Sequence, residues 1–180
     1  MTDATPTPEA APDPAPAPAP DPTTVTNADL PHLRRCVELA QAARDRTDHP
    51  FGSVLVTADG RTVEAMNTVV TQGDPTGHAE TNLVRLAAAR LPAEVLATST
   101  LYTSTEPCAM CAGAIYWGGI TRVVYALSEE GLAELVAAQE GVPTMDLPCR
   151  EVFARGGHPV AVAGPADLPE AVAVHDGFWV

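Results

Sequence analysis

The sequence is poor in aromatic residues, poor in basic residues and without long apolar runs. Aromatic side chains make up 4% of its 180 residues, and 23 acidic residues outnumber 10 basic ones, for a net charge of -13. No apolar stretch approaches the roughly 20 residues that a membrane-spanning helix needs, and the N-terminus lacks a secretion signal pattern. We therefore expect a cytoplasmic protein without a membrane partner. Its acidity argues against a nucleic-acid partner, which usually requires a basic patch.

Cysteine is also scarce, and two of the four cysteines form a close pair. Cys108 and Cys111 are separated by two residues, whereas Cys36 and Cys149 are isolated. In a chain without a secretion signal, a Cys-x-x-Cys pair indicates metal or redox chemistry before a structural disulfide. Cys36 lies in an apolar helical pattern and is expected in the core, and we assign no role to Cys149. The pair alone leaves open the alternative of two buried cysteines without a metal.

Proline dominates the beginning of the chain. From Pro12 to Pro22 it occupies every second position, and such a segment has no core to bury and favours an extended polyproline conformation. We therefore expect a disordered tail over residues 1–26 and one folded domain over residues 27–180. A solubilising role for the tail is preferred over partner binding.

The apolar periodicity of residues 27–180 predicts five strands and five helices. Asp59 and Gly60 mark a tight turn between the first two strands, which predicts a hairpin. A hairpin followed by alternating helices and strands predicts a mixed sheet with helices on both faces. The predicted strands are 51–56, 62–70, 99–104, 121–126 and 159–163, and the predicted helices are 27–46, 78–90, 107–117, 129–139 and 148–154.

Cys108 and Cys111 become a candidate metal site when His78 is added. Thiolates and imidazole are ligands that zinc prefers, and a helical turn brings the sulfurs of residues three apart to one side. Pro107 suits the first position of a helix whose N-terminus would favour thiolates. A structural zinc site would have four protein ligands. Three ligands leave one position for water, which is typical of a catalytic zinc site.

Glu80 is the predicted proton carrier of this site. A hydrolytic zinc site needs a base that takes a proton from water and later delivers it, and Glu80 is two residues from His78. On a regular helix these two positions point about 200° apart, so they converge only if the helix begins there. A capping histidine and a surface glutamate are the simpler interpretations of each residue alone. The pair followed by Thr105-Glu106-Pro107-Cys108 favours a single site.

These segments resemble the cytidine-deaminase superfamily of zinc-dependent enzymes. The resemblance covers about residues 28–140 and implies an α/β fold, a three-layer α-β-α arrangement around a mixed five-stranded sheet. It also implies one Zn²⁺ per chain, bound by His78, Cys108 and Cys111, with Glu80 as the catalytic residue of a hydrolytic deamination. The segments that carry the resemblance are Pro50–Val56, Asn67, Gly77–Asn82 and Leu101–Trp117.

Within that superfamily, guanine is the favoured substrate. Histidine as the first ligand is more similar to guanine deaminases and tRNA adenosine deaminases than to small cytidine deaminases, and the Tyr116-Trp117 pair resembles bacterial guanine deaminases. The resemblance further implies that Asn67 binds the purine and that Phe51 lines the pocket. A turn asparagine and a buried strand aromatic are the alternatives. The predicted substrate-contacting residues are Asn67, Phe51, Trp117, Ala79 and Asp146.

Residues 141–180 leave other functions open. The chain ends in Phe178-Trp179-Val180, and aromatic side chains at a chain end are expected to pack, either as a lid over the pocket or against the sheet edge. This ending differs from the one expected of a guanine deaminase, so a nucleoside, cytosine, a pterin or a triazine stays open as substrate. A tRNA adenosine deaminase and a zinc-bearing regulatory module are the rival functions. The resemblance implies a homodimer, with or without a swapped C-terminal segment.

Overall fold

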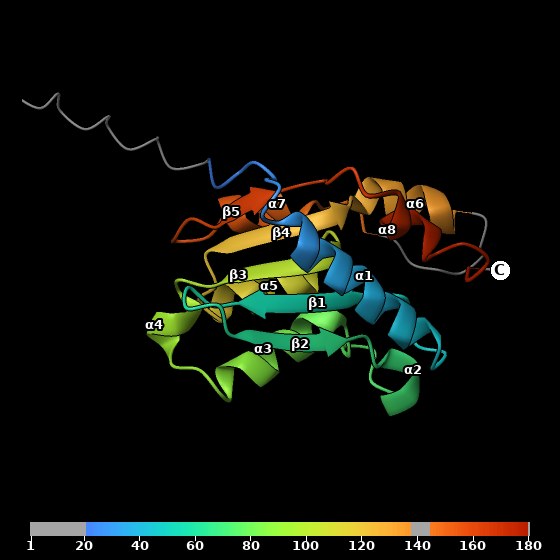
Figure 1. The fold of residues 1–180 in the computed structure, drawn as a ribbon, viewed down its shortest axis with the longest axis horizontal. Helices are drawn as coiled ribbons and strands as arrows, with labels where there is room; N and C mark the ends of the chain where they lie inside the picture. Colours follow the sequence, from blue (N-terminus) through green and yellow to red (C-terminus); the bar gives the residue numbers. More distant parts are fainter. Residues whose placement is uncertain (1–20, 138–144, 180) are drawn as a thin grey trace, which may run out of the picture.

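A five-stranded mixed sheet forms the centre of the domain (Figure 1). The computed structural model describes residues 21–137 and 145–179 of the chain. The strand order is β2-β1-β3-β4-β5, with β1 antiparallel to both of its neighbours and β3, β4 and β5 parallel, which confirms the predicted mixed sheet. The strands are β1 (Gly52–Val56), β2 (Thr62–Met66), β3 (Thr100–Thr105), β4 (Arg122–Leu127) and β5 (Ala161–Ala163).

Helices cover both faces of this sheet, which confirms the predicted three-layer α/β architecture. Successive strand residues point to opposite faces, so Val54 and Tyr102 pack toward α1, whereas Leu55 and Leu101 pack toward α3 and α5. The helices are α1 (Leu30–Arg44) and α8 (Pro169–Ala173) on one face, α3 (Ala79–Ala88), α5 (Ala109–Trp117) and α7 (Cys149–Ala154) on the other, and the connecting helices α2 (Val69–Gln72), α4 (Ala93–Leu96) and α6 (Glu129–Val136).

The sequence pattern does not predict α2, α4 or α8. These helices are four or five residues long, too short for an apolar repeat to stand out. The second strand ends at Met66 rather than at residue 70, because the Asn67 side chain accepts a hydrogen bond from the backbone nitrogen of Val69 (3.0 Å), where α2 begins. No helix in the described part of the chain is both long and apolar enough to cross a membrane.

The end of the proline-rich segment contacts the folded domain at Pro22, five residues before the predicted domain boundary at residue 27. The Arg122 guanidinium donates to the Pro22 carbonyl (3.2 Å) and to both carboxylate oxygens of Asp29 (2.9 and 3.1 Å), which ties the segment before α1 to β4. Residues 1–20 of the predicted tail and residues 138–139 of the predicted helix 129–139 lie outside the described residues.

The close approach of α1 to β1 sets the position of the functional site. A Cβ atom on Gly52 would lie 2.3 Å from the Cys36 carbonyl oxygen of α1, so this packing requires glycine. The Gly52 carbonyl oxygen lies 3.4 Å from the Thr103 hydroxyl oxygen of the neighbouring β3. Strand β3 then ends at Thr105, three residues before Cys108. The predicted metal ligands therefore lie at the carboxyl end of a central strand.

Candidate active site

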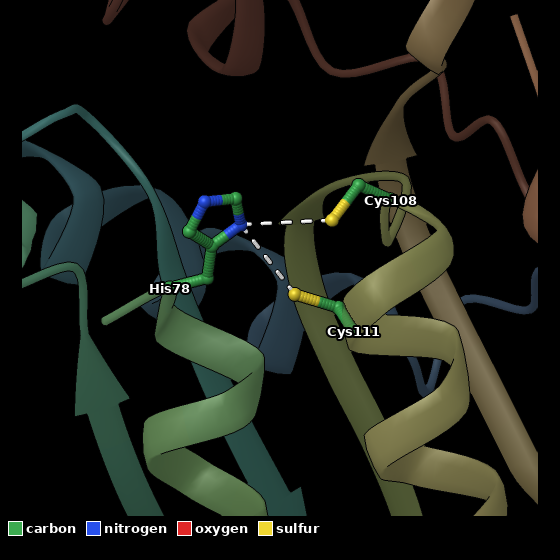
Figure 2. A group of neighbouring side chains, drawn as sticks. All are labelled: His78, Cys108 and Cys111. Atoms are coloured by element: carbon green, nitrogen blue, oxygen red, sulfur yellow. Dashed lines mark hydrogen bonds between the residues drawn. The ribbon is translucent and has the colours of Figure 1, made fainter. Parts of the chain in front are cut away.

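Three metal-binding side chains meet where helices α3 and α5 begin. His78 is the N-cap residue of α3, Cys108 is the N-cap residue of α5, and Cys111 lies in the first turn of α5. Figure 2 shows the His78 ring and the two sulfurs pointing toward one another. Helix α5 begins at Ala109, two residues after Pro107, which the sequence places at the first helical position. The two cysteines still face one side, because an N-cap residue and the third residue of a helix are neighbours in space.

The spacing of the three ligand atoms fits a zinc ion. His78 Nδ1 is 3.7 Å from Cys108 Sγ and 3.5 Å from Cys111 Sγ. Zinc bonds of about 2.0–2.1 Å to nitrogen and about 2.3 Å to sulfur, at a tetrahedral angle, separate the two ligand atoms by about 3.6 Å. Among residues 21–137 and 145–179, the side chains that could bind a metal ion at this place are His78, Cys108 and Cys111. A zinc ion that it binds keeps a fourth position for water or substrate.

Glu80 lies beside these ligands although it is only two residues from His78. His78 has an extended backbone (φ -67°, ψ 153°), and α3 begins at Ala79, so His78 is not part of the regular helix. The Glu80 carboxylate accepts hydrogen bonds from the Cys111 thiol (3.4 Å) and from the Thr103 hydroxyl (3.1 Å). Because His78 precedes the helix, its side chain and that of Glu80 are not held about 200° apart, as they would be within a regular helix.

Burial tunes the charge of this cluster. Glu80 is only 5% exposed, and desolvation raises the pKa of its carboxyl group above the ordinary value. Hydrogen bonds from Cys111 and from His78 lower the pKa of the Cys108 thiol to about 4, against the effect of burial. The N-termini of α3 and α5 both point at the cluster and add positive potential. The site therefore stabilises a thiolate ligand next to a carboxyl group that can hold a proton.

Asn67 lies next to the segment that carries His78. The backbone nitrogen of Thr68 donates to the carbonyl of Gly77 (2.8 Å), the residue before His78. Asn67 is fully buried, and its Oδ1 accepts from the Val69 backbone nitrogen (3.0 Å). This contact identifies the other side-chain atom as Nδ2, which has no hydrogen-bond partner among the described residues. Asn67 thus keeps an unused donor in the interior, one residue from the backbone contact with the His78 segment.

Two further predicted residues, Phe51 and Ala79, lie in the same region. The Phe51 carbonyl accepts from the backbone nitrogen of Asn67 (3.0 Å), which places the start of β1 next to the end of β2. Ala79 is fully buried between His78 and Glu80, as the first residue of α3. These positions allow both residues to border a substrate at the metal.

Trp117 is exposed at the far end of α5, and Asp146 lies on the surface. Trp117 is the last residue of α5, roughly 9 Å along the helix axis from Cys111, and 86% of its side chain is exposed. Its ring packs against Tyr116 (5.4 Å between centroids), outside the ligand cluster. Asp146 is exposed.

His49 and Thr103 lie near the candidate site but were not among the residues predicted from the sequence. Thr103 is a buried polar residue of strand β3, and its hydroxyl donates to Glu80. A threonine in an otherwise buried strand is the sequence signal that could have identified it. His49 lies in the loop before β1. Burial, and then the nearby His78, lower its pKa. The rings of Phe178 and Trp179 lie 6.1 and 5.4 Å from the His49 ring, so the chain end packs on the His49 side of the site.

Comparisons with known proteins agree with this geometry. Residues 26–127 match the model of the cytidine and deoxycytidylate deaminase zinc-binding region. A "Probable cytosine deaminase" of Schizosaccharomyces pombe is 40% identical over 157 residues, which cover 87% of this chain and 96% of that protein. The guanine deaminase of Bacillus subtilis is 43% identical over 103 residues, which cover 57% and 66% of the two chains. A solved structure of a tRNA:A34 deaminase has a TM-score of 0.61 at 29% identity, covering 81% and 99%.

Proposed function

Because the chain belongs to the cytidine and deoxycytidylate deaminase family of zinc-dependent hydrolytic deaminases, we propose that it removes the amino group from a free nucleobase. The family establishes deamination of a nucleobase or nucleoside. The choice of a free base rests on the relatives named for cytosine and guanine, and Asn67 favours a base that carries a carbonyl group. The reaction consumes water and releases ammonia, leaving a carbonyl in place of the amino group.

Glu80 is the residue that moves protons in this reaction. A zinc ion bound by His78, Cys108 and Cys111 would polarise a water molecule and make it nucleophilic near neutral pH. Glu80 accepts a proton from the attacking water and delivers it to the ring nitrogen next to the amino-bearing carbon. It then takes the remaining proton of the newly added hydroxyl group and transfers it to the amino group, which leaves as ammonia. The Thr103 hydroxyl orients one carboxylate oxygen, which leaves the other directed toward Cys111.

The unused donor of Asn67 is the observation that favours a base with a carbonyl group. A buried N–H group without a partner costs about 1–3 kcal/mol, so a substrate that supplies an acceptor gains that much. Cytosine and guanine both carry a ring carbonyl oxygen next to a ring nitrogen, whereas adenine has no carbonyl group. The Asn67 amide is therefore suited to a base of the first kind.

Between these two bases, we place cytosine first and guanine second. Tyr116 and Trp117, which favoured guanine at the level of the sequence, lie away from the metal ligands. The relative named for cytosine aligns with all but 23 residues of the chain, so the alignment reaches into the last forty residues. Guanine stays the second candidate because the first metal ligand is a histidine and the Bacillus subtilis guanine deaminase is 43% identical over 103 residues.

A tRNA substrate is less compatible with the surface charges. Helix α1 carries three arginines and a fourth, Arg46, follows it, but each of them contacts an acidic side chain or backbone carbonyls. The chain has a net charge of -13, and binding to a nucleic-acid backbone depends on unpaired basic groups. A mobility-shift titration with tRNA is expected to show no salt-sensitive complex.

Replacing Asn67 with alanine is the sharpest test of this proposal. We expect wild-type protein to release ammonia from cytosine or guanine, and Asn67→Ala to lower kcat/KM about 10- to 100-fold, the effect of losing one buried hydrogen bond to the substrate. Zinc content should remain at one ion per chain. The exposed Asn27→Ala serves as the control and should behave as wild type. Ammonia release from adenosine in tRNA but from no free base would refute the proposal.

We also propose a cytoplasmic homodimer that forms through α5. The residues of α5 are apolar on all sides, and such helices are usually buried, yet Met110 is 38% and Trp117 is 86% exposed. Cys108 and Cys111 must stay reduced to bind zinc, as they do in the cytoplasm. Sedimentation should give a dimer, and Trp117→Glu should yield monomers. A monomeric wild-type protein would exclude this interface.

A further inference from the structure

One arginine of α1 holds the segment that follows α8. We call this segment, Val174 to Trp179, the C-terminal strap. The Arg44 guanidinium donates to the carbonyl oxygens of Val174 (2.7 Å) and Asp176 (2.6 Å), and it lies 5.9 Å from the centre of the Phe178 ring. A single planar cation therefore contacts three residues of the strap, a geometry that the guanidinium group favours.

His175 fixes the last aromatic residue of the strap. The Trp179 indole N–H donates to Nδ1 of His175 (3.1 Å), and the two rings are nearly parallel (17°). His175 is 2% exposed, and burial, followed by the nearby Arg44, lowers the pKa of its imidazole to about 4, while Asp176 acts in the opposite direction. The imidazole is therefore neutral near pH 7 and can accept this hydrogen bond through Nδ1.

The indole that His175 orients packs against the start of β1. The Trp179 ring is 5.4 Å from the ring of His49 and 6.1 Å from the ring of Phe51. The Phe51 carbonyl accepts a hydrogen bond from the backbone nitrogen of Asn67 (3.0 Å), whose side chain carries the unused donor. The strap thus ends against residues that are direct neighbours of Asn67.

We propose that Arg44 and His175 are positioning residues that hold Trp179 as one wall of the pocket for a flat heterocyclic base. Neither residue touches the reacting atoms: Arg44 binds the backbone of the strap, and His175 binds the indole nitrogen. Aromatic faces stack well on planar rings, so a fixed indole favours binding of the base. This inference rests on the proposed function for the identity of that base.

The test uses the full zinc-loaded chain with Trp117→Phe. This substitution leaves Trp179 as the only tryptophan and replaces a side chain that lies away from the site. In this background, Arg44→Gln and His175→Phe are each expected to raise KM for the base about tenfold, the effect of one lost hydrogen bond, and to change kcat much less. Both should move the Trp179 emission to longer wavelength before substrate is added, because the indole becomes more exposed to water.

Conservative variants and a matched control separate positioning from folding. Arg44→Lys keeps a cation and His175→Gln keeps an acceptor, so each should recover part of the lost affinity. Arg34→Gln removes a cation from the same helix whose partner is Glu170 of α8, and it should leave KM and emission unchanged. Wild-type KM and emission in both Arg44→Gln and His175→Phe would overturn the proposal, and so would loss of zinc and of helical structure in all four variants. If no base is turned over, the proposed function fails, while the Trp179 emission still decides whether Arg44 and His175 hold the indole.

Discussion

Replacing Glu80 with glutamine is expected to lower kcat about 10²- to 10⁴-fold while one zinc ion per chain is retained. This is the range over which a positioned proton-transfer group contributes to catalysis. Glutamine has the size of glutamate and can keep the hydrogen bond from Thr103, but it cannot accept and deliver a proton. Because the lost interaction acts in the transition state, kcat and kcat/KM should fall together. Steady-state ammonia release and metal analysis of the same preparation measure both quantities.

Two companion variants define what this result means. Thr103→Val removes the hydroxyl that orients the Glu80 carboxylate and should reduce kcat by about tenfold, the effect of one lost hydrogen bond. Glu94→Gln changes an exposed acid in α4 and should have wild-type activity. A Glu80→Gln protein with full kcat would show that another group transfers the protons. Loss of zinc in this variant would instead assign Glu80 to metal binding.

The metal ligands could be predicted because they depend on local sequence. Histidine and cysteine are the residue types that zinc prefers, and the Cys108–Cys111 spacing needs only one helical turn. The convergence of His78 and Glu80 was expected if a helix began there, and α3 does begin at Ala79. These two local features could be read from the sequence, whereas the contact of His78 with cysteines 30 and 33 positions away was implied by the resemblance to the deaminase family.

The substrate side depends on contacts between distant parts of the chain. Trp117 was expected in the pocket because the Tyr116-Trp117 pair resembles bacterial guanine deaminases, but Trp117 is the last residue of α5 and its side chain is exposed to solvent. The contacts of Arg44 with the strap join residues that are 130 and 132 positions apart. Apolar periodicity carries no information about contacts between residues so far apart in the sequence. Helix α8, which precedes the strap, has only five residues and is too short to be predicted from periodicity.

Replacing Cys111 with serine is expected to remove the zinc ion and with it the activity. Serine is nearly isosteric, but its hydroxyl does not ionise near neutral pH and is a poor zinc ligand, whereas a thiolate is a preferred one. His78 and Cys108 alone would leave the ion with two protein ligands. We expect less than about one tenth of the wild-type zinc after dialysis, and ammonia release reduced at least about 10³-fold, since a bound zinc ion supplies several kcal/mol of transition-state stabilisation.

Cys36→Ala is the matched control for the cysteine substitution. Cys36 is also fully buried, but it lies in α1 on the opposite face of the sheet. Its replacement should cost about 1 kcal/mol of folding free energy through lost packing and leave zinc and kcat unchanged. Retained zinc in Cys111→Ser would point to a fourth protein ligand and thus to a closed, structural site. Full activity without zinc would contradict the hydrolytic role assigned to the cluster, because Glu80 alone has no nucleophile strong enough to attack the ring.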